Sequence, residues 1–586
     1  MKKLLPLAAA VMLASANLYA DGSTATTTQN GADNTAATSQ TGTGHSATVA
    51  QDVAYGSTVM VQQSGDGQIA TATQTDYVDS SSITIDQQGS LNTANASQDH
   101  TYNVTADIDQ TGISNNADVN QAHVDDSEVT VDQQGSSNDA IVRQYGFGIH
   151  NPAGATVLQT GNGNKANTNQ DTSTDSTVTV TQTGDSNQAT SDQLAGSVNS
   201  SVVIDQITDG AYAKATQTGS SNSEVTIDQN DGSSASAIVS QLNGDSNVAS
   251  VTQTYRTDGA SSALVSQNGS NNRATTYQEH VRSTSLTVDQ TGGANTATVN
   301  QEHVNNSSAG VIQVGDGNTA TVRQYGWGSH EPASATVDTV GNLNNVNINQ
   351  DDSYRAAASV DQVGDSNTVG IDQVVMSNYS QVHVDQIDGS VSGSVTVLQT
   401  EATSSSVTVS QSAVDGSTVS VTQHIGDDLI ANVTQTGTLG GSVAIDQTGT
   451  TQLATVSQTG TANMAVVNQS DSLNVTEITQ SGDTNAATVN QFGTEQVASI
   501  TQAGSFNVSG VLQSASLNDA DIDQSGAYNV ADISQSGIDN DAIIMQSGLG
   551  SVASLNTAII IQSAAMDYAS ITQMGGAGNS ATITQQ

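Results

Sequence analysis

The histidine and acidic side chains are the groups in this sequence whose type and spacing could support chemistry. His100 and His123 each lie two residues after a glutamine, and His280 and His303 lie 180 residues further on in the same placement. Acidic residues such as Asp99 adjoin them. An imidazole beside a carboxylate could hold a transition metal weakly or sense protons. We expect solvated turn histidines, with the metal-binding or proton-sensing edge as the alternative.

Motifs for catalysis are missing from the sequence. It has no G-x-S-x-G nucleophile turn, no H-E-x-x-H motif, no P-loop and no cysteine. The acidic pairs Asp125-Asp126 and Asp351-Asp352 could hold calcium, but no EF-hand loop and no repeated calcium-binding nonapeptide accompany them. We therefore predict that the protein is not an enzyme and needs no cofactor.

Two glycine-rich segments carry aromatic residues beside histidine and proline. Phe147 lies in one of them, and Trp327, the single tryptophan, lies in the other. Aromatic rings in loops suit contacts with carbohydrate or with a protein partner. The alternative is that each ring folds back onto the side of the molecule.

Composition excludes several classes of protein. The chain of 586 residues has 56 acidic residues against 10 basic ones, so its formal net charge of −46 argues against a nucleic-acid-binding protein. Only 3% of the residues are aromatic and 35% are hydrophobic, which is too little for a large conventional core. Such a composition is typical of disorder unless a regular repeat organises it.

A regular repeat of glutamine does organise the chain. Glutamine recurs every 11 residues from Gln458 to Gln546, and at spacings of mostly 11 to 13 elsewhere, with Thr339 in one slot. The series begins at Gln29, Gln40, Gln51 and Gln62. The commonest interval reads Q-x-G-x-x-N-x-A-x-x-x-Q. Its ladder residues include Gln87, Asn92, Gln98, Gln110, Asn115, Gln121, Gln290, Asn295, Gln301, Gln458, Asn463, Gln469, Gln480, Asn485, Gln491, Gln524, Asn529 and Gln535, and its turn glycines include Gly89, Gly112, Gly292, Gly460, Gly482 and Gly526.

Residues around each glutamine alternate between apolar and polar, as in Val443, Ile445 and Gln447. This period of two indicates strands of about five residues, joined by turns of about six. One strand with its turn cannot bury a face alone, so two of these units would fold into a flat rung that stacks on the next. We therefore predict an all-β solenoid of about 24 stacked rungs of about 22–24 residues. Identical Gln and Asn side chains would lie above one another in amide ladders, as in cross-β stacks.

Proline placement separates the solenoid from a disordered chain. Proline cannot donate a backbone hydrogen bond and is excluded from central strands. Pro152 and Pro332 fall in the two places where the ladder interval stretches to 15 residues. A disordered polar chain predicts no such placement.

The N-terminus predicts export. Lys2 and Lys3 precede an apolar run that ends in small residues up to Ala20, which is typical of a secretory signal peptide over residues 1–20. No later stretch is apolar enough to span a membrane. We expect residues 21–586 to form one continuous repeat solenoid, with an internal duplication of 87–208 in 267–388 and the most regular repeats in 435–586.

The motif Q-x-G-x-x-N-x-A-x-x-x-Q, followed by a V-x-Q strand, resembles the curlin repeat over nearly all of the exported chain. Curlins are subunits of curli, the extracellular amyloid fibres of Gram-negative bacteria. The resemblance implies polymerisation at the cell surface on a nucleator subunit, after secretion and passage through a dedicated outer-membrane pore. It further implies roles in biofilm matrix and adhesion. Curlins are much shorter, so a giant subunit and a curlin-repeat adhesin both fit.

A second class of function remains open. A monomeric secreted solenoid could bind ice or polysaccharide through outward threonine rows such as Thr177 and Thr179, although other residues interrupt these rows. A polysaccharide lyase or hydrolase on a β-helix would need long loops with basic and aromatic residues, which the short turns do not provide.

Overall fold

Short strands follow from the alternation of small apolar and polar residues. The computed structural model describes residues 20–146, 152–231, 233–255, 257, 260–326 and 332–586, and every helix or strand assigned within them is a strand. The strands form parallel β-solenoid coils, about 24 in all. The predicted fold class is therefore confirmed.

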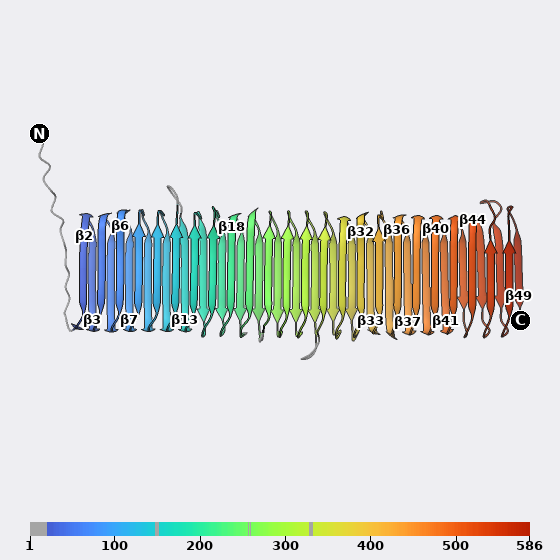
Figure 1. Ribbon diagram of the computed structural model, residues 1–586, viewed down its shortest axis with the longest axis horizontal. Helices are drawn as coiled ribbons and strands as arrows, with labels where there is room; N and C mark the ends of the chain where they lie inside the picture. The colour runs from blue at the N-terminus through green and yellow to red at the C-terminus, as the bar shows by residue number, and fades with distance from the viewer. Residues whose placement is uncertain (1–19, 147–151, 232, 256, 258–259, 327–331) are drawn as a thin grey trace, which may run out of the picture. The chain divides into compact units, whose positions relative to one another are not determined.

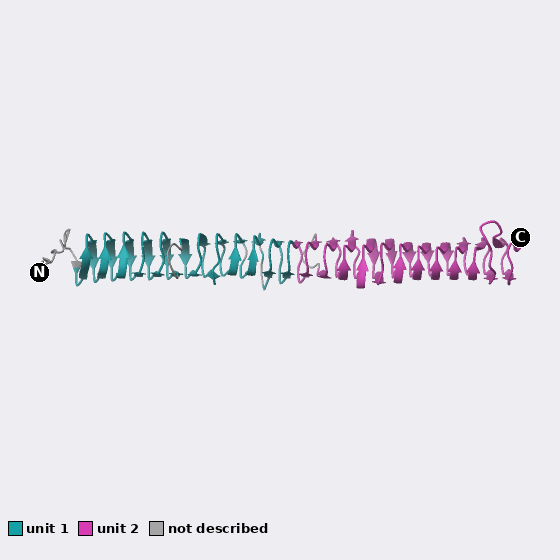
Figure 2. Cartoon of the chain, turned by 90° about the horizontal axis from the view of Figure 1, so that it is seen from above, with its two compact units in different colours: residues 1–294 teal, residues 295–586 magenta. Residues whose placement is uncertain are grey.

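The chain divides into two compact units, residues 1–294 and residues 295–586, which Figure 2 colours separately. In unit 1, the odd-numbered strands form one sheet and the even-numbered strands form the other (Figure 1). The odd-numbered strands are β1 (Ala20–Asp21), β3 (Thr35–Thr43), β5 (Thr58–Asp66), β7 (Ser82–Ser90), β9 (Thr105–Ile113), β11 (Glu128–Ser136), β13 (Ala153–Asn162), β15 (Ser176–Thr183), β17 (Ser201–Ile207), β19 (Glu224–Asn230), β21 (Val248–Thr254) and β23 (Arg273–Glu279). The even-numbered strands are β2 (Thr24–Ala32), β4 (Ser46–Tyr55), β6 (Ile69–Asp79), β8 (Thr93–Asp99), β10 (Asn116–Ala122), β12 (Asp139–Tyr145), β14 (Lys165–Asp171), β16 (Gln188–Leu194), β18 (Tyr212–Ser221), β20 (Ser236–Asp245), β22 (Ser262–Asn268) and β24 (Ser285–Thr291).

Unit 2 has the same organisation. Its odd-numbered strands are β25 (Thr296–Glu302), β27 (Thr319–Tyr325), β29 (Asn345–Asp351), β31 (Thr368–Val374), β33 (Ser394–Thr403), β35 (Thr418–Asp427), β37 (Ser442–Thr450), β39 (Met464–Ser472), β41 (Ala486–Thr494), β43 (Val508–Gln513), β45 (Asn529–Gln535), β47 (Asn556–Gln562) and β49 (Ser580–Gln585). Its even-numbered strands are β26 (Ser308–Val314), β28 (Ser334–Val340), β30 (Ala357–Asp365), β32 (Gln381–Val391), β34 (Ser406–Ser412), β36 (Ile430–Leu439), β38 (Leu453–Thr461), β40 (Val475–Asp483), β42 (Val497–Ser505), β44 (Asp519–Ala527), β46 (Asp541–Gln546) and β48 (Tyr568–Gln573).

Within each unit, strands pair in parallel with the second strand after them, and equivalent residues of the repeat lie opposite one another. In unit 1, Gln74 of β6 lies opposite Gln98 of β8. In unit 2, Gln469 of β39 lies opposite Gln491 of β41. Consecutive strands belong to different sheets, so one coil contributes one strand to each sheet. A one-residue slip would turn every inward side chain outward, and the alternating pattern therefore fixes the register.

The core is a thin layer between the two sheets. Val443 and Ile445 of β37 are each 2% exposed, and Gln447 of the same strand is fully buried. Val129 and Val131 of β11 are buried in the same way. Small side chains fill this narrow space, which explains how a chain with few aromatic residues can fold.

The strands are longer than the predicted five residues, because the backbone keeps pairing beyond the glutamine. β7 runs for nine residues and includes Gly89, which lies opposite Gly112 of β9. Gly89 has φ of 112°, and a Cβ atom there would lie 2.0 Å from the carbonyl oxygen of Gly112. Glycine is required at this position because any side chain would collide with the next coil.

Some predictions fall outside the described residues. Residues 1–19 of the expected signal peptide, Phe147 and Trp327 all lie there. In the described part of the chain, no helix is long and apolar enough to cross a membrane. The continuous solenoid over 21–586 and the duplication remain predictions.

Candidate functional site

Glutamine side chains form hydrogen-bonded ladders inside each unit. In unit 1, Gln87 Nε2 donates to Gln110 Oε1 at 2.8 Å, and Gln110 Nε2 donates to Gln133 Oε1 at 2.7 Å. In unit 2, Gln458 Nε2 donates to Gln480 Oε1 at 2.8 Å. These buried amides therefore satisfy one another from coil to coil. The same bond connects the pairs Gln98–Gln121, Gln121–Gln144, Gln267–Gln290, Gln301–Gln324, Gln469–Gln491, Gln480–Gln502, Gln491–Gln513, Gln524–Gln546 and Gln535–Gln562.

Many ladder glutamines also tie the two sheets together. Gln480 of β40 uses its amide nitrogen to donate to the backbone oxygen of Met464 in β39 at 2.9 Å. Gln98 of β8 donates to the backbone oxygens of Ser82 and Val104 at 3.0 and 3.2 Å. The amide group of one buried glutamine thus donates hydrogen bonds both to the next coil and to the opposite sheet.

One predicted member of the glutamine series is wrong. Gln62 points outward and is exposed, whereas the neighbouring Gln63 is buried and accepts a hydrogen bond from Gln40 Nε2 at 2.9 Å. The extra residue lies within β4, where the register of pairing shifts between Asp52 and Ala54 and Val53 has a positive φ. Two adjacent glutamines made the register ambiguous in the sequence.

The asparagine columns differ from the predicted amide ladder. Asn92 Nδ2 donates to the backbone oxygens of Gln88 and Gly112 at 3.1 and 3.2 Å, while its Oδ1 accepts the backbone N–H of Asn115 at 3.0 Å. Most of these asparagines therefore hold the turn backbone instead of another asparagine side chain, because their shorter side chain lies at the turn. The same donation to a turn carbonyl is made by Asn115, Asn295, Asn463, Asn485 and Asn529, and Asn529 also donates to the side chain of Asn507.

The turn glycines adopt the conformation that their residue type favours. Each has a positive φ, between 96° and 127°. They are Gly89, Gly112, Gly292, Gly460, Gly482 and Gly526.

Thr339 interrupts one ladder of unit 2. It lies opposite Gln313 of β26 and Gln362 of β30, where the neighbouring coils place glutamine. Its hydroxyl donates to the backbone oxygen of Ile312 at 3.3 Å. Gln362 Oε1 is consequently buried without a hydrogen-bond donor. Thr339 is thus a local defect in the polar core.

Near the two ends of the described chain, strands β2 and β49 leave their inward residues accessible. In β49, the inward residues Ala581, Ile583 and Gln585 are only partly buried, whereas those of β47 are fully buried. In β2, all but two of the nine residues are exposed. These end strands present unpaired backbone groups and apolar side chains to solvent.

Acidic residues form columns on the outer face of the sheets. Asp86, Asp109 and Asp132 lie opposite one another in β7, β9 and β11. Burial raises the pKa of Asp109, and the neighbouring carboxylates of Asp132, Asp86 and Asp107 raise it further. The pKa of Asp107 is also raised, first by burial and then by Glu128 and Asp86. Like charges therefore repel along this column.

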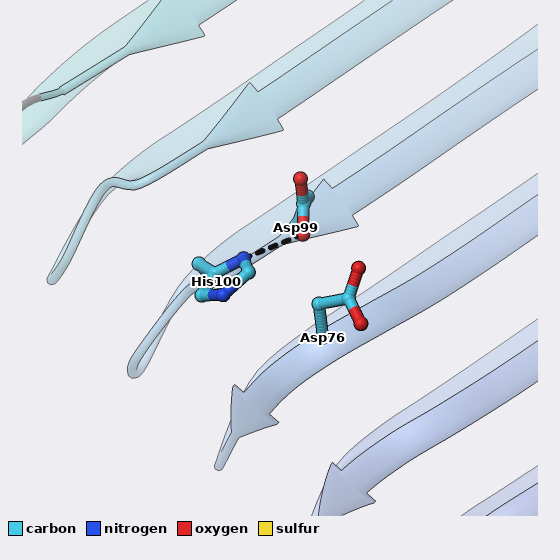
Figure 3. Close-up of side chains that lie close together, drawn as sticks. All are labelled: Asp76, Asp99 and His100. Atoms are coloured by element: carbon cyan, nitrogen blue, oxygen red, sulfur yellow. Dashed lines mark hydrogen bonds and ion pairs between the residues drawn. The ribbon is translucent and has the colours of Figure 1, made fainter.

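In unit 1, His100 and His123 lie in a row of aromatic rings on neighbouring coils. His100 stacks on His123, with ring centroids 4.9 Å apart and an interplanar angle of 4°. Tyr77 lies 5.8 Å from His100, and Tyr145 lies 5.6 Å from His123. His100 Nδ1 lies 2.8 Å from Asp99 Oδ1 (Figure 3).

The later histidines have similar surroundings. His280 stacks on Tyr255 at 5.7 Å, and its Nδ1 lies 3.5 Å from Glu279 Oε1. In unit 2, His303 lies 5.6 Å from Tyr325. Whether any of these four histidines binds metal remains a prediction.

Sequence reasoning overlooked Asp76 at this edge. Its carboxylate lies close to the Asp99 carboxylate and the His100 ring, and these three side chains form one group of possible metal ligands (Figure 3). Asp76 follows Gln74 by two residues, the offset at which His100 follows Gln98. Aligning the turns by their preceding glutamine would have placed Asp76 and His100 at equivalent positions of neighbouring coils.

The fold and the ladders define a repeat-built β-solenoid. Five segments match the curlin associated repeat, at residues 125–150, 294–326, 474–504, 497–524 and 518–548. The chain therefore contains curlin associated repeats. No curated protein matches the sequence. Curlin repeats on a solenoid indicate a structural or adhesive, extracellular and self-associating protein rather than an enzyme.

Proposed function

We propose that this protein is a structural subunit of an extracellular curli-like amyloid fibre that grows by stacking of coils from successive copies. The fibre would serve biofilm matrix and cell adhesion. The observation that carries the proposal is the accessible inward face of the end strands. An exposed, regular strand edge is a template for another strand, and the best-matched strand belongs to a second copy of the same repeat.

The lack of charged residues in the end strands supports stacking between copies. The sequences of β2, β3, β48 and β49 contain no charged residue, although the chain as a whole is strongly acidic. Like charges placed opposite one another destabilise strand pairs. Stacking β48 and β49 of one copy on β2 and β3 of the next would therefore avoid the carboxylate repulsion found in the acidic columns.

The direction of the ladders supports a head-to-tail contact. Within each unit, the glutamine amide nitrogen donates toward the C-terminal coil, as in Gln546 to Gln573 and Gln562 to Gln585. At the last coil, Gln573 and Gln585 donate to backbone oxygens at 2.9 and 3.0 Å. A primary amide has a second N–H, and it would reach the oxygens of Gln29 and Gln40 in a following copy.

Partners follow from the family. We propose that a nucleator subunit starts the fibre and that a curli-type outer-membrane export machinery secretes the chain after removal of residues 1–20. The acidic surface fits the prediction of no nucleic-acid partner. A large curlin-repeat adhesin would use the same coils with little polymerisation.

A proline at the outer edge of β49 tests the proposal. Thr557 of β47 lies opposite Ser580 and donates its N–H to the following coil, at Asn579 O. N–H groups alternate in direction along a parallel strand, so the N–H of Thr582 points away from β47. The variant Thr582→Pro should fold but fail to elongate seeds, because proline removes that donor at the edge.

Thr582→Val is the matched control, because valine keeps both the N–H and the β-branched shape. Elongation is followed by thioflavin fluorescence with preformed fibres as seeds. We expect wild-type elongation for Thr582→Val and at least a tenfold slower rate for Thr582→Pro. Equal rates for the two variants would contradict growth through this edge.

A further inference from the structure

We propose that Asp76, Asp99 and His100 form a binding site for a divalent transition-metal cation of the Zn²⁺ type. One carboxylate oxygen from each aspartate and one ring nitrogen of His100 all lie within 4.8 Å of one another. Figure 3 shows the three side chains on two neighbouring coils, with the Asp76 carboxylate beside that of Asp99. The inference is independent of fibre formation, because every ligand comes from unit 1.

The backbone holds these ligands in place. Thr75 of β6 lies opposite Asp99 of β8, and the N–H of His100 donates to Thr75 O at 3.3 Å. The N–H of His123 in turn donates to Asp99 O at 2.9 Å. Asp76 and His100 share a left-handed backbone conformation, with φ of 56° and 50°. Little further ordering would be needed for the ligands to meet one ion.

The imidazole is oriented by its neighbours. His123 stacks on one face of His100, and Tyr77 lies tilted by 46° at 5.8 Å. Nδ1 of His100 points at the Asp99 carboxylate at 2.8 Å. A metal ion bound by Nδ1 would take the place of this contact between the ring and the Asp99 carboxylate.

The surroundings of the site favour a cation. Asp79 lies on the same turn edge, and it aligns through Tyr102 with Asp125 of the second coil beyond. Asp126 lies on this edge too and accepts a hydrogen bond from Asn103. The sequence contains no lysine or arginine between Lys3 and Arg143, so no basic side chain of this stretch can neutralise the edge.

The ligand set selects the class of metal. Calcium and magnesium prefer oxygen ligands alone, whereas imidazole with carboxylate suits Zn²⁺ and neighbouring transition metals. Three protein ligands also leave a position for water, as in open zinc sites. The ion would bridge two coils and hold the turn that follows β6 against the turn that follows β8.

Equilibrium dialysis of the full-length protein against ZnCl₂ at pH 7, with CaCl₂ in parallel, tests the site. We expect wild-type protein to bind one Zn²⁺ more per chain than His100→Ala does, and to bind Ca²⁺ at least tenfold more weakly at this site. Asp76→Asn should weaken the same Zn²⁺ site at least tenfold, since it removes a charged ligand while preserving shape. Circular dichroism verifies that both variants remain folded.

Asp79→Asn is the control, because it removes one negative charge from the same edge without removing a proposed ligand. It should retain the Zn²⁺ lost in His100→Ala. Unchanged Zn²⁺ binding in His100→Ala, or an equal loss in Asp79→Asn and Asp76→Asn, would overturn the proposal.

Discussion

Gln480 donates a hydrogen bond from Nε2 to Gln502 Oε1 at 2.8 Å and accepts one from Gln458 Nε2 at the same distance. Both sides of one buried amide are therefore satisfied by identical residues of neighbouring coils. A buried polar group is costly only when it lacks partners. The repeat thus turns glutamine, normally a surface residue, into the continuous element of the core.

Replacing Gln480 by leucine should destabilise the solenoid. The variant leaves Gln502 Oε1 without its donor and removes the acceptor of Gln458, and each loss costs about 1–3 kcal/mol. We expect a lower urea midpoint by circular dichroism. Thr479→Ala, at the outward position beside it, should change the midpoint much less. A stability of Gln480→Leu equal to that of Thr479→Ala would show that the ladder contributes little.

Thr339→Gln should have the opposite effect. The new amide would stand opposite Gln362, whose Oε1 is buried without a donor, and would continue the ladder. We expect a gain of about 1 kcal/mol, the net value of a typical hydrogen bond. Thr336→Gln, an outward substitution in the same strand, serves as control. A loss of stability in Thr339→Gln would mean that the coil has adapted to threonine.

Much of this fold could be predicted, because the spacing of glutamine along the sequence matches the register in which the strands pair. Alternation around Gln447 indicated which side of β37 is buried, and the spacing of glutamine indicated which residues stack. The spacing argument failed at Gln62 and Gln63, since an extra residue within β4 decides which of the two side chains points inward. The sequence also could not predict the hydrogen-bond partners of Asn92, because they depend on the path of the backbone at Gly112.

The residues around His100 could be predicted only in part. The sequence indicated that His100 and His123 would stack, because both follow their glutamine by two residues. It did not indicate Asp76, since a single aspartate in a chain with 56 acidic residues carries no signal until the turns are superimposed.

Gly89→Ala should be strongly destabilising. Alanine would place Cβ 2.0 Å from Gly112 O in the next coil, at a φ of 112° that side chains rarely adopt. We expect a loss of more than about 2 kcal/mol, which urea unfolding measures. Gly56→Ala is the matched control, because Gly56 also has a positive φ, of 60°, but no atom within 4 Å of the added Cβ. Similar losses in both variants would exclude contact with the next coil as the cause.

Mild acid should stabilise the folded chain. Burial and neighbouring carboxylates raise the pKa of Asp109 above its ordinary value of 3.8, so the folded state binds this proton more tightly than the unfolded state does. The resulting stabilisation is complete below the unfolded pKa and is lost as the pH rises through the higher folded pKa. Burial raises the pKa in the same direction for Asp107, Asp205, Asp228, Asp338, Asp519, Asp521 and Asp532.

Urea midpoints between pH 3.5 and 7 measure this dependence. We expect the midpoint to rise as the pH falls from neutral toward the ordinary carboxyl range. Asp109→Asn should flatten the dependence slightly and should stabilise the protein at neutral pH, since it removes repulsion from Asp86 and Asp132. A midpoint that falls steadily from pH 7 to pH 5 would contradict the assigned directions.

The central claim is that coils of separate copies stack as coils of one chain do. Seeded assembly of residues 21–586, diluted from denaturant and followed by thioflavin fluorescence, electron microscopy and fibre diffraction, tests it most directly. The account predicts sigmoidal growth that seeds accelerate, and fibres with a meridional reflection at ~4.7 Å. A soluble β-rich monomer that stays monomeric with seeds present would contradict it, and would favour a secreted binding protein.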